Sequence, residues 1–504
     1  MRVLISILLF NQLIFSANIL SNCIVAPDTR TFERFQFTFP EQIESEHFIV
    51  HFTTSNADSQ FVNEQWLNLQ CNFGYAQSVI ELAEYALAIF MEADWEMMPP
   101  DCDEGITDEE SPNHCNNFGG NALYDIYLAN DAVGLVAPEN PYPVEPYIGG
   151  FTSFMQVTPL GNDHAFVPDW SVHVIAHELH HAIQIRYGTS VSGEPGNYAY
   201  NGWLYEQTST YMENVIFPAS YHFLVMMGNC NITSPLTYPE ISIDSSVDIY
   251  QYRSALWQKF LVEAYGDSTI NRLIWEGFGL ETATGNPVNM FPIYESALQT
   301  VTDGVTTLGD AYEDYALWRY FTGSRSRPGE FFMQAASYCT ANLLAIEETS
   351  TTFPSEKGGA RLVKLLPYET NLVLASSAYD NLLVQHISFS EEDEILMSSI
   401  EVNGEESFFQ LYNPAGDNHA LLITSEYTGE PGEEIEFTLA NTVPFMEGDI
   451  TGDSMVNVQD IIVQINIILH QIDPTEYQWL AADLDENNVV DVLDVILLVN
   501  LILG

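Results

Sequence analysis

Hydrophobic and polar residues alternate with the period of a β-strand early in the chain. Residues 45–53 alternate in this way, and residues 123–129 and 149–157 have the short apolar and aromatic runs of further strands. Two other segments, Tyr75 to Ala93 and Trp170 to Tyr187, repeat apolar residues every three to four positions, which is the period of an amphipathic helix. The pattern therefore predicts that strands come before the 170–187 helix.

Helical periodicity continues further along the chain. Asn201 can cap a helix that extends to Glu213. Other helical patterns cover residues 250–265, 268–276 and 309–320. Strands followed by helices predict an α+β domain, divided by a cleft, over residues 23–345.

Near residue 346 the pattern changes to short alternating segments rich in Thr, Ser and Gly, separated by turn signals such as Pro414-Ala-Gly. Five of these segments are candidate strands: 361–366, 371–375, 382–387, 408–412 and 419–424. They predict a small β-sandwich over residues 346–443. It carries no catalytic constellation, so we interpret it as a spacer or a substrate-presenting module.

The last 60 residues contain an internal repeat. Asp449 to Asp460 and Asp483 to Asp494 align at loop positions 1, 3, 5, 9 and 12, and an apolar helix follows each loop, over residues 461–469 and 495–503. Oxygen donors at these positions, with a backbone carbonyl at position 7, are typical of a calcium loop. The predicted calcium ligands are Asp449, Thr451, Asp453, Met455, Asn457 and Asp460 in the first loop, and Asp483, Asp485, Asn487, Val489, Asp491 and Asp494 in the second. Residues 444–504 are thus expected to form an all-α domain that binds two Ca²⁺ ions.

The motif H-E-x-x-H occupies residues 177–181, inside the predicted 170–187 helix. Residues four apart share one helix face about 6 Å apart along the axis, so His177 and His181 can bind one zinc ion. Glu178 would then lie beside the open coordination position, where a carboxylate can take a proton from an activated water. The motif therefore indicates hydrolysis as well as a metal.

Two further histidines surround this motif. His173 and His177 form a second pair with the same spacing, but no glutamate follows His173, so we interpret His173 and His180 as outer-sphere or packing residues. Asp169 can cap the helix and Gly188 can end it. The alternative is a surface helix that carries solvated histidines.

A catalytic zinc ion usually has three protein ligands. Glu206 is the best candidate for the third, because it follows His181 after 24 intervening residues on the predicted 201–213 helix. Glu206, Ser209, Thr210 and Glu213 form one stripe on that helix. Glu213 is the competing candidate.

These motifs resemble the gluzincin peptidases, in which a W-L-x-E-G-x-A-x-Y-x-E helix supplies its first glutamate to zinc. The segment from Trp203 to Glu213 matches that helix, with Gln207 and Ser209 in place of Gly and Ala. By this match Glu206 is the third zinc ligand. The resemblance implies a zincin-like fold and peptide-bond hydrolysis.

The fuller pattern includes residues 252–261 and 274–277 and is similar to a family of secreted bacterial metallopeptidases over roughly residues 45–345. The spacer is longer than in the aminopeptidase branch, and no G-x-M-E-N exopeptidase motif is present, so the resemblance favours an endopeptidase. Gluzincins often use a tyrosine to stabilise the oxyanion, and Tyr252 or Tyr250 is the candidate among 26 tyrosines. Residues 149–157 form either the edge strand that pairs with substrate in zincins or an ordinary core strand.

The duplicated loop and helix resembles the type I dockerin domain, in which position 12 is Asp rather than the Glu usual in EF-hands. Dockerins bind cohesins through residues on their helices. Here Val458-Gln459 and Val492-Leu493 come just before the two position-12 aspartates. The resemblance implies attachment to a cohesin-bearing scaffold.

The formal charge of −57, from 70 acidic and 13 basic residues, argues against nucleic acid as a partner because phosphate backbones would be repelled. Since 46% of the residues are hydrophobic and 12% aromatic, the chain can still bury large cores, and the acidity is expected on the surface.

Residues 1–22 have the Arg and apolar run of a secretory signal, and no other apolar run is long enough to span a bilayer. We therefore expect an extracellular or cell-surface-associated protein with no transmembrane anchor. Six cysteines occur without a C-x-x-C motif. Cys102 and Cys115 are expected to form a disulfide, with a Cys71 pairing as the alternative.

The sequence as a whole predicts a secreted zinc-dependent metalloendopeptidase. Its substrate would be a protein or peptide, and the dockerin would bind it to a cohesin-bearing scaffold. The alternative is a catalytically degenerate peptidase fold that acts as a binding module on the scaffold. Hydrolysis of another amide or an ester is a third possibility, since the same activated water serves all of these reactions.

Overall fold

The structure is a computed structural model, and its described residues form two compact units. The first unit extends to Asn342 and includes Ser355–Arg361 and the described part of Thr424–Glu434; the second comprises the remaining residues to the C-terminus. The described residues are 34–62, 65–100, 102, 114–129, 134–161, 163–189, 201–282, 288–345, 351–356, 358–365, 369–389, 394–402, 404–412, 418–425, 434–441, 447–451, 455–472, 474, 476–485, 487 and 489–503. The predicted signal over residues 1–22 and the predicted calcium ligand Asp453 lie outside them.

The first unit is built on a five-stranded sheet with the strand order β1-β2-β5-β7-β6. Its strands are β1 (Glu41–Glu44), β2 (Phe48–Phe52), β5 (Tyr124–Tyr127), β6 (Gly134–Pro141) and β7 (Phe151–Val157). β2, β5 and β7 are parallel, whereas β1 and β6 are antiparallel to their neighbours. All residues of β2 and β5 are buried, as expected for parallel strands covered on both faces.

The position of β7 decides between the two interpretations of residues 149–157. β7 lies between β5 and β6, so it is an interior strand of the sheet, and β6 is the strand at the edge. Of the two alternatives for residues 149–157, the edge strand is therefore excluded and the core strand is confirmed. Sequence could not separate the two because β6 enters the sheet through its pairing with β7 from Gly134 to Pro141.

A buried charge cluster attaches the segment before β1 to this sheet. The Arg34 guanidinium donates two hydrogen bonds to Glu139 on β6, at 2.9 and 2.7 Å, and also contacts Asp125 on β5. His51 on β2 contacts the same aspartate. Because Asp125 is fully buried, these partners offset the cost of removing its charge from water.

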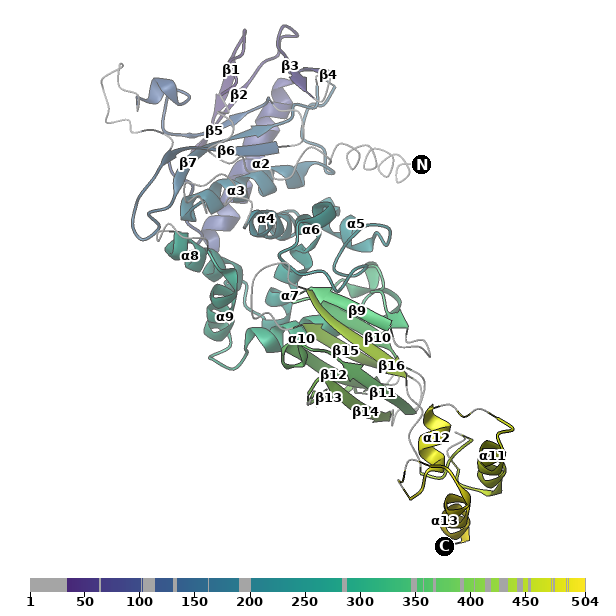
Figure 1. Cartoon of the computed structure of the whole chain (residues 1–504). Coiled ribbons are helices and arrows are strands. Elements are labelled where there is room, and N and C mark those ends of the chain that lie inside the picture. The colour runs from purple at the N-terminus through teal and green to yellow at the C-terminus, as the bar shows by residue number, and fades with distance from the viewer. Residues whose placement is uncertain are drawn as a thin grey trace. The chain divides into compact units, whose positions relative to one another are not determined.

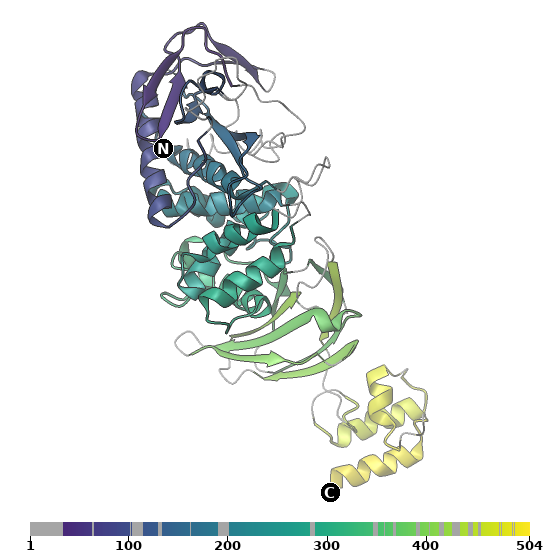
Figure 2. The ribbon, with the colours of Figure 1, turned by 90° about the vertical axis from the view of Figure 1, so that its left-hand side faces the viewer.

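Two helices pack against the sheet (Figure 1). α2 (Phe73–Glu92) contacts β2 and β1, and α3 (Val172–Tyr187) contacts β7, β6 and α2. Figure 2 shows the long α2 helix beside the strands from a second side. The predicted helices over 75–93 and 170–187 are thus confirmed. Asn72 caps α2 by accepting a hydrogen bond from the Gly74 amide at 2.8 Å.

Helices form the rest of the first unit, and α4 packs directly on α3. They are α4 (Gly202–Ile216), α5 (His222–Gly228), α6 (Tyr250–Arg253), α7 (Ala255–Tyr265), α8 (Ile270–Thr282), α9 (Met290–Val301) and α10 (Leu308–Tyr320). The helix predicted over 250–265 is divided at Ser254 into α6 and α7. A two-stranded hairpin of β3 (Ser59–Val62) and β4 (Gln65–Asn68) also belongs to this unit.

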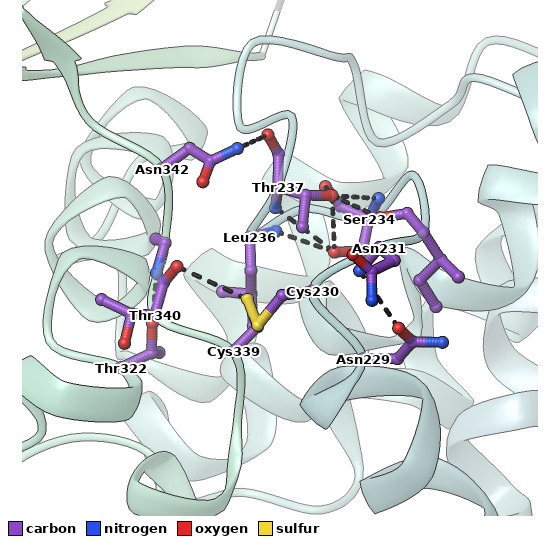
Figure 3. The surroundings of a disulfide bond; sticks show 12 residues. Asn229, Cys230, Asn231, Ser234, Leu236, Thr237, Thr322, Cys339, Thr340 and Asn342 are labelled. Carbon is purple, nitrogen blue, oxygen red and sulfur yellow. Dashed lines mark hydrogen bonds between the residues drawn. A yellow bond between two sulfur atoms is a disulfide. The ribbon is translucent and has the colours of Figure 1, made fainter. Parts of the chain in front are cut away.

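Two disulfides occur in the described residues. Cys102 pairs with Cys115, as predicted, and Cys230 pairs with Cys339, while Cys71 is a buried free thiol. The second disulfide joins the segment after α5 to the segment after α10 (Figure 3). Near it, the Asn342 amide donates to the Thr237 carbonyl. This cross-link fixes an irregular segment that leads into α6.

The second unit contains a β-sandwich of two sheets, with the orders β13-β12-β15-β10-β8 and β14-β11-β16-β9. Its strands are β8 (Leu344–Ala345), β9 (Thr351–Glu356), β10 (Ala360–Lys364), β11 (Glu369–Ala375), β12 (Leu382–Phe389), β13 (Leu396–Ile400), β14 (Glu406–Tyr412), β15 (Asn418–Ser425) and β16 (Glu434–Asn441). Leu374, Val384, Phe437 and Leu421 come from both sheets and belong to one core. The predicted sandwich is confirmed by this arrangement.

Three helices follow the sandwich: α11 (Val458–Ile468), α12 (Glu476–Ala482) and α13 (Val492–Leu503). They share a small core that includes Ile450, Ile467, Ala481 and Leu498. Among the described residues, no helix combines the length and apolar character needed to cross a membrane.

Candidate metal centre

The H-E-x-x-H motif lies in the buried middle of α3. His177, Glu178 and His181 are 5%, 1% and 0% exposed, so the alternative of a solvated surface helix is wrong. The helix ends at Gly188, as predicted, but it begins after Ser171, which makes no side-chain cap, rather than with a cap from Asp169. Asn201 likewise precedes α4 without capping it, because its amide donates to the Val288 carbonyl at 3.1 Å instead.

Glu206 reaches both histidines from α4. Its Oε2 atom lies 3.1 Å from His177 Nε2 and 3.3 Å from His181 Nε2. The three ligand-type atoms lie within 4.8 Å of one another, and all three side chains are buried. The structure thus brings together the three residues that the sequence selected as zinc ligands.

The contact between His177 and Glu213 shows which nitrogen of the His177 ring carries the proton. His177 Nδ1 lies 2.7 Å from Glu213 Oε1. A carboxylate can accept a hydrogen bond but cannot donate one, so Nδ1 is the donor. His177 Nε2 lies 3.1 Å from Glu206 Oε2, and in a neutral ring with Nδ1 protonated it would present its lone pair on that side, where a cation between the two atoms would accept it.

His181 has the same arrangement with a neutral partner. Its Nδ1 atom lies 2.7 Å from Gln184 Oε1. The Gln184 amide nitrogen donates to the Tyr205 carbonyl at 3.1 Å, which fixes the oxygen of this amide toward His181. His181 Nδ1 is therefore the donor, and Nε2 presents a lone pair to Glu206.

Three atoms of metal-ligand type consequently lie close together. Burial lowers the pKa of His181, which favours a neutral ring. Burial acts to raise the pKa of Glu206, whereas protonated His181 and His177 would lower it to about 2, so an anionic Glu206 at this buried position needs positive charge beside it. Two imidazole nitrogens and one carboxylate oxygen fit a zinc ion with one coordination position left open.

Glu178 lies beside the first strand residue of β6. A Cβ atom placed on Gly134 would be 2.5 Å from Glu178 Cγ and 2.6 Å from its Oε1. The absence of a side chain at Gly134 therefore leaves the space that the Glu178 side chain occupies.

The two tyrosine candidates differ in their surroundings. The Tyr252 ring on α6 stacks near His177, with ring centroids 6.0 Å apart and planes inclined by 20°. Tyr250 is buried, and its hydroxyl donates to the Ile241 carbonyl at 3.3 Å. Tyr252 is therefore the candidate that the structure places beside the metal-ligand residues.

Glu213 is not placed as the third ligand. Its Oε1 atom accepts from His177 Nδ1, and its Oε2 atom contacts His222 Nδ1 on α5. This geometry makes Glu213 a hydrogen-bond partner of the two histidines rather than a zinc ligand. His222 was not selected by the sequence, since no spacing rule links α5 to α3.

His173, Glu213 and His222 also lie close enough together to suggest a second cation site. The His173 and His222 rings, however, stack with centroids 4.0 Å apart and planes inclined by 18°. Lone pairs of stacked parallel rings run side by side instead of converging, and both Glu213 oxygens already have imidazole partners. We therefore interpret Glu213 and His222 as a hydrogen-bonded support for His177, with the His173 ring stacked on His222.

His180 is a packing residue, as predicted. Its fully buried ring stacks on Phe90, with centroids 5.2 Å apart, and meets Trp95 edge-on. Burial holds its pKa well below the usual value, so the ring is neutral.

The calcium loops are organised around their position-12 carboxylates. Asp460 accepts hydrogen bonds from the Thr451 and Asn457 amides, both at 2.8 Å. Asp494 accepts from the Leu484 and Asp491 amides at 2.9 and 2.8 Å. Both aspartates are fully buried. The repeat thus folds into two loops of the same design.

Several of the other predicted calcium ligands lie close to these carboxylates. In the second loop, ligand atoms of Asp483, Asp485 and Asp494 lie within 4.8 Å of one another. At position 9, Asn457 and Asp491 accept from the amides of Gln459 and Leu493 and so also cap the helices that follow. The other predicted ligands within the described residues are Asp449, Thr451, Met455, Asn487 and Val489.

Comparison with known proteins identifies two segments of the chain. Residues 165–292 match a family described as "Family of unknown function (DUF6055)", and this range contains His177, His181 and Glu206. Residues 447–503 match the dockerin type I domain, which confirms the prediction for the C-terminal repeat. No curated protein matches the chain.

One similar solved structure is the pre-peptidase C-terminal domain of a collagenase from Bacillus anthracis. It is 12% identical, covers 20% of this chain and 93% of its own, and has a TM-score of 0.15. A score this low carries no argument about fold or function.

Proposed function

We propose that this protein is a secreted zinc-dependent metalloendopeptidase, held by its dockerin domain on a cohesin-bearing scaffold. The observation that carries the proposal is the convergence of His177 Nε2, His181 Nε2 and Glu206 Oε2, which lie within 4.8 Å of one another on three buried side chains. When bound there, zinc would supply Lewis-acid chemistry, which lowers the pKa of water and polarises a carbonyl group.

The protein side chains would perform the proton transfers. Glu178, one residue after the ligand His177, would accept a proton from the attacking water and pass it to the leaving amine. The Tyr252 hydroxyl would donate a hydrogen bond to the oxyanion that forms at the substrate carbonyl. Its stacked position near His177 supports this assignment over Tyr250, whose hydroxyl bonds to a backbone carbonyl.

Strand β6 supports a peptide as the substrate. β6 is the last strand in the sheet order, and its first residue, Gly134, lies against the Glu178 side chain. An extended peptide could add to this edge as a further strand through main-chain hydrogen bonds. Such binding would place a peptide bond beside Glu178 whatever the side chains of the substrate, in keeping with an endopeptidase.

The dockerin match supports calcium binding, a cohesin partner and an extracellular location. Apolar side chains on its helices are exposed, which suits a protein partner. They include Val458 at 62%, Ile462 at 56% and Leu493 at 57% exposure. Docking there would hold the peptidase on its scaffold.

The test is the Glu178→Gln variant. It keeps the size and hydrogen-bonding capacity of the side chain but cannot accept the proton, so we expect wild-type zinc content and a loss of casein hydrolysis of at least about 100-fold. Zinc is measured by mass spectrometry of the purified protein and hydrolysis by release of labelled peptides.

Two outcomes would contradict the proposal. Hydrolysis of casein by Glu178→Gln at the wild-type rate would exclude Glu178 as the base. Zinc-loaded wild-type protein that cleaves no member of a diverse peptide library would instead indicate a binding module.

A further inference from the structure

A buried polar network lies behind His181, on the side away from Glu206. It joins Gln184 on α3 to Tyr205, Thr208 and Ser209 on α4, and all four side chains are at most 2% exposed. Because a buried polar group needs a partner, each donor in this network has a definite direction.

The Thr208 hydroxyl fixes the donors and acceptors at one end of the network. Its hydroxyl donates to the Leu204 carbonyl at 2.6 Å, so its oxygen is left as an acceptor. The Trp275 indole, which can only donate, lies 3.1 Å from this oxygen. The Gln184 amide nitrogen lies 2.8 Å from it and must also donate.

The orientation of the Gln184 amide follows from these contacts. The Thr208 oxygen and the Tyr205 carbonyl accept the two protons of its nitrogen, which also lies 3.0 Å from His180 Nδ1, and so the nitrogen cannot be exchanged with its oxygen. Gln184 Oε1 is then held 2.7 Å from His181 Nδ1, where it accepts the ring proton. His181 is thereby fixed in the tautomer that leaves Nε2 free for a metal.

Ser209 and His180 complete the support. Ser209 Oγ lies 3.1 Å from His181 Nδ1 and 3.0 Å from His180 Nδ1. The Gln184 amide nitrogen, 3.0 Å from His180 Nδ1, cannot accept a hydrogen bond, so His180 Nδ1 is an acceptor and the Ser209 hydroxyl donates to it. The Ser209 oxygen is then a second acceptor for His181.

We propose that Gln184 is a positioning residue for the metal centre: it selects the tautomer and ring orientation of His181 and thereby sets the affinity of the site for zinc. Ser209 assists as the second acceptor. This inference rests on the proposed zinc site but assigns a role to residues outside the ligand set. Outer partners of metal-bound histidines typically contribute about 10- to 100-fold to metal affinity.

The test compares Gln184→Met with Gln184→Glu in the full-length protein. Met is similar in size and lacks the acceptor, so we expect zinc affinity, measured by competition with a chromogenic chelator, to fall by about 10- to 100-fold. Glu keeps an acceptor toward His181 but loses the amide donor, so its zinc affinity should stay within about threefold of wild type or rise.

Two further readouts separate positioning from folding. The melting temperature of the zinc-free protein reports structural damage, and Trp275→Phe, which removes a donor to Thr208 without touching Gln184 or His181, is the matched control. Gln184→Met should recover hydrolysis at saturating zinc.

The result that would overturn the inference is an unchanged zinc affinity in Gln184→Met. Equal losses in Gln184→Met and Gln184→Glu would also overturn it, since the acceptor would then be irrelevant. If the wild-type protein itself binds no zinc through His181, the proposed function fails instead, and the two failures are thus distinguished.

Discussion

At the scale of single residues, each imidazole of the proposed zinc site is held by an acceptor on its outer nitrogen. Glu213 accepts from His177 at 2.7 Å, and Gln184 accepts from His181 at the same distance. An anionic partner makes an imidazole a stronger metal ligand than a neutral one does. We therefore expect His177 to be a stronger zinc ligand than His181, although both come from one short motif.

The space beside Glu178 gives a prediction about Gly134. A Cβ atom there would lie 2.5 Å from Glu178 Cγ, so Gly134→Ala must move the proposed base. A displacement of about 1 Å can cost about 100-fold in rate, and we expect a loss of that order in kcat/KM for casein. Zinc content should be unchanged, because no metal-ligand residue is touched. A variant within threefold of the wild-type rate would show that Glu178 does not act from this position.

A second residue-scale prediction concerns His386 in the sandwich. His386 Nε2 lies 3.0 Å from His419 Nδ1, and burial, with a contribution from His419, lowers the pKa of His386 to about 4. In the unfolded chain the pKa is about 6.5. As the pH falls from about 6.5 to 4, the unfolded state binds a proton that the folded state does not, so the free energy of unfolding decreases in this window. The loss reaches at most about 3 kcal/mol at pH 4.

Thermal unfolding at pH 7, 6, 5 and 4 tests this prediction. We expect the sandwich transition of His386→Gln to depend less steeply on pH below 6.5 than that of the wild type. Parallel pH profiles for the two proteins would show that His386 does not control the acid sensitivity.

The candidate site was largely predictable from sequence because its ligands follow local rules. His177 and His181 are one helical repeat apart, and Glu206 lies on a helix with a recognisable pattern. His222 could not be found in this way, since its contact with Glu213 depends on how α5 packs. Gln184 is close in sequence to His181, but its role depends on an amide orientation that is set by α4.

At the scale of secondary structure, the longest periodic segments were predicted best. α3 extends over Val172–Tyr187, within two residues of the predicted range. The division between α6 and α7 was not predicted, because Arg253 donates to the Thr233 and Asp248 carbonyls, which come from an irregular segment. Positive φ angles at Asp248 and Ile249, 48° and 57°, also mark this entry to α6 and have no periodic signal.

The segment between α5 and α6 gives the element-scale prediction. The Cys230–Cys339 disulfide closes a sequence separation of 109 residues, whereas Cys102–Cys115 closes 13. In the chain-entropy account a longer loop restricts the unfolded state more, by about 4.7 kcal/mol near 100 residues against about 3 kcal/mol near 15. The Cys230→Ser, Cys339→Ser double variant should therefore unfold at a lower temperature than the Cys102→Ser, Cys115→Ser variant.

Calorimetry of both double variants and the wild type under non-reducing conditions provides the comparison. An equal or smaller effect for the Cys230 pair would show that contacts such as Asn342 with Thr237 fix this segment without the disulfide.

At the scale of the whole molecule, the chain combines a mixed α/β unit, a β-sandwich and a dockerin type I domain. Alternation and turn signals were sufficient to predict the sandwich, and the repeated ligand spacing was sufficient to predict the dockerin. The strand order in the first unit was not predictable, since an interior strand and an edge strand of a mixed sheet can have the same apolar pattern. The domain boundaries at residues 22, 345 and 443 stay predictions.

The calcium loops and the proposed zinc site belong to different parts of the chain, which leads to a prediction about calcium binding. Asp494 lies with Asp483 and Asp485 in the second loop and accepts two backbone hydrogen bonds there. We expect Asp494→Ala to bind one calcium ion instead of two, because the position-12 carboxylate is lost. Zinc content and casein hydrolysis should equal those of the wild type.

Calcium titration calorimetry measures the stoichiometry, and Asp460→Ala in the first loop is the matched variant. Two calcium ions bound to Asp494→Ala would contradict the ligand assignment. A loss of zinc from the same variant would contradict the independence of the two metal sites.

The central claim is a zinc ion bound by His177, His181 and Glu206, and anomalous diffraction at the zinc absorption edge tests it most directly. Crystals of the zinc-loaded protein should show a peak about 2.0–2.2 Å from His177 Nε2, His181 Nε2 and a Glu206 oxygen. Absence of a peak between these three side chains, or a peak among His173, Glu213 and His222 instead, would contradict the account.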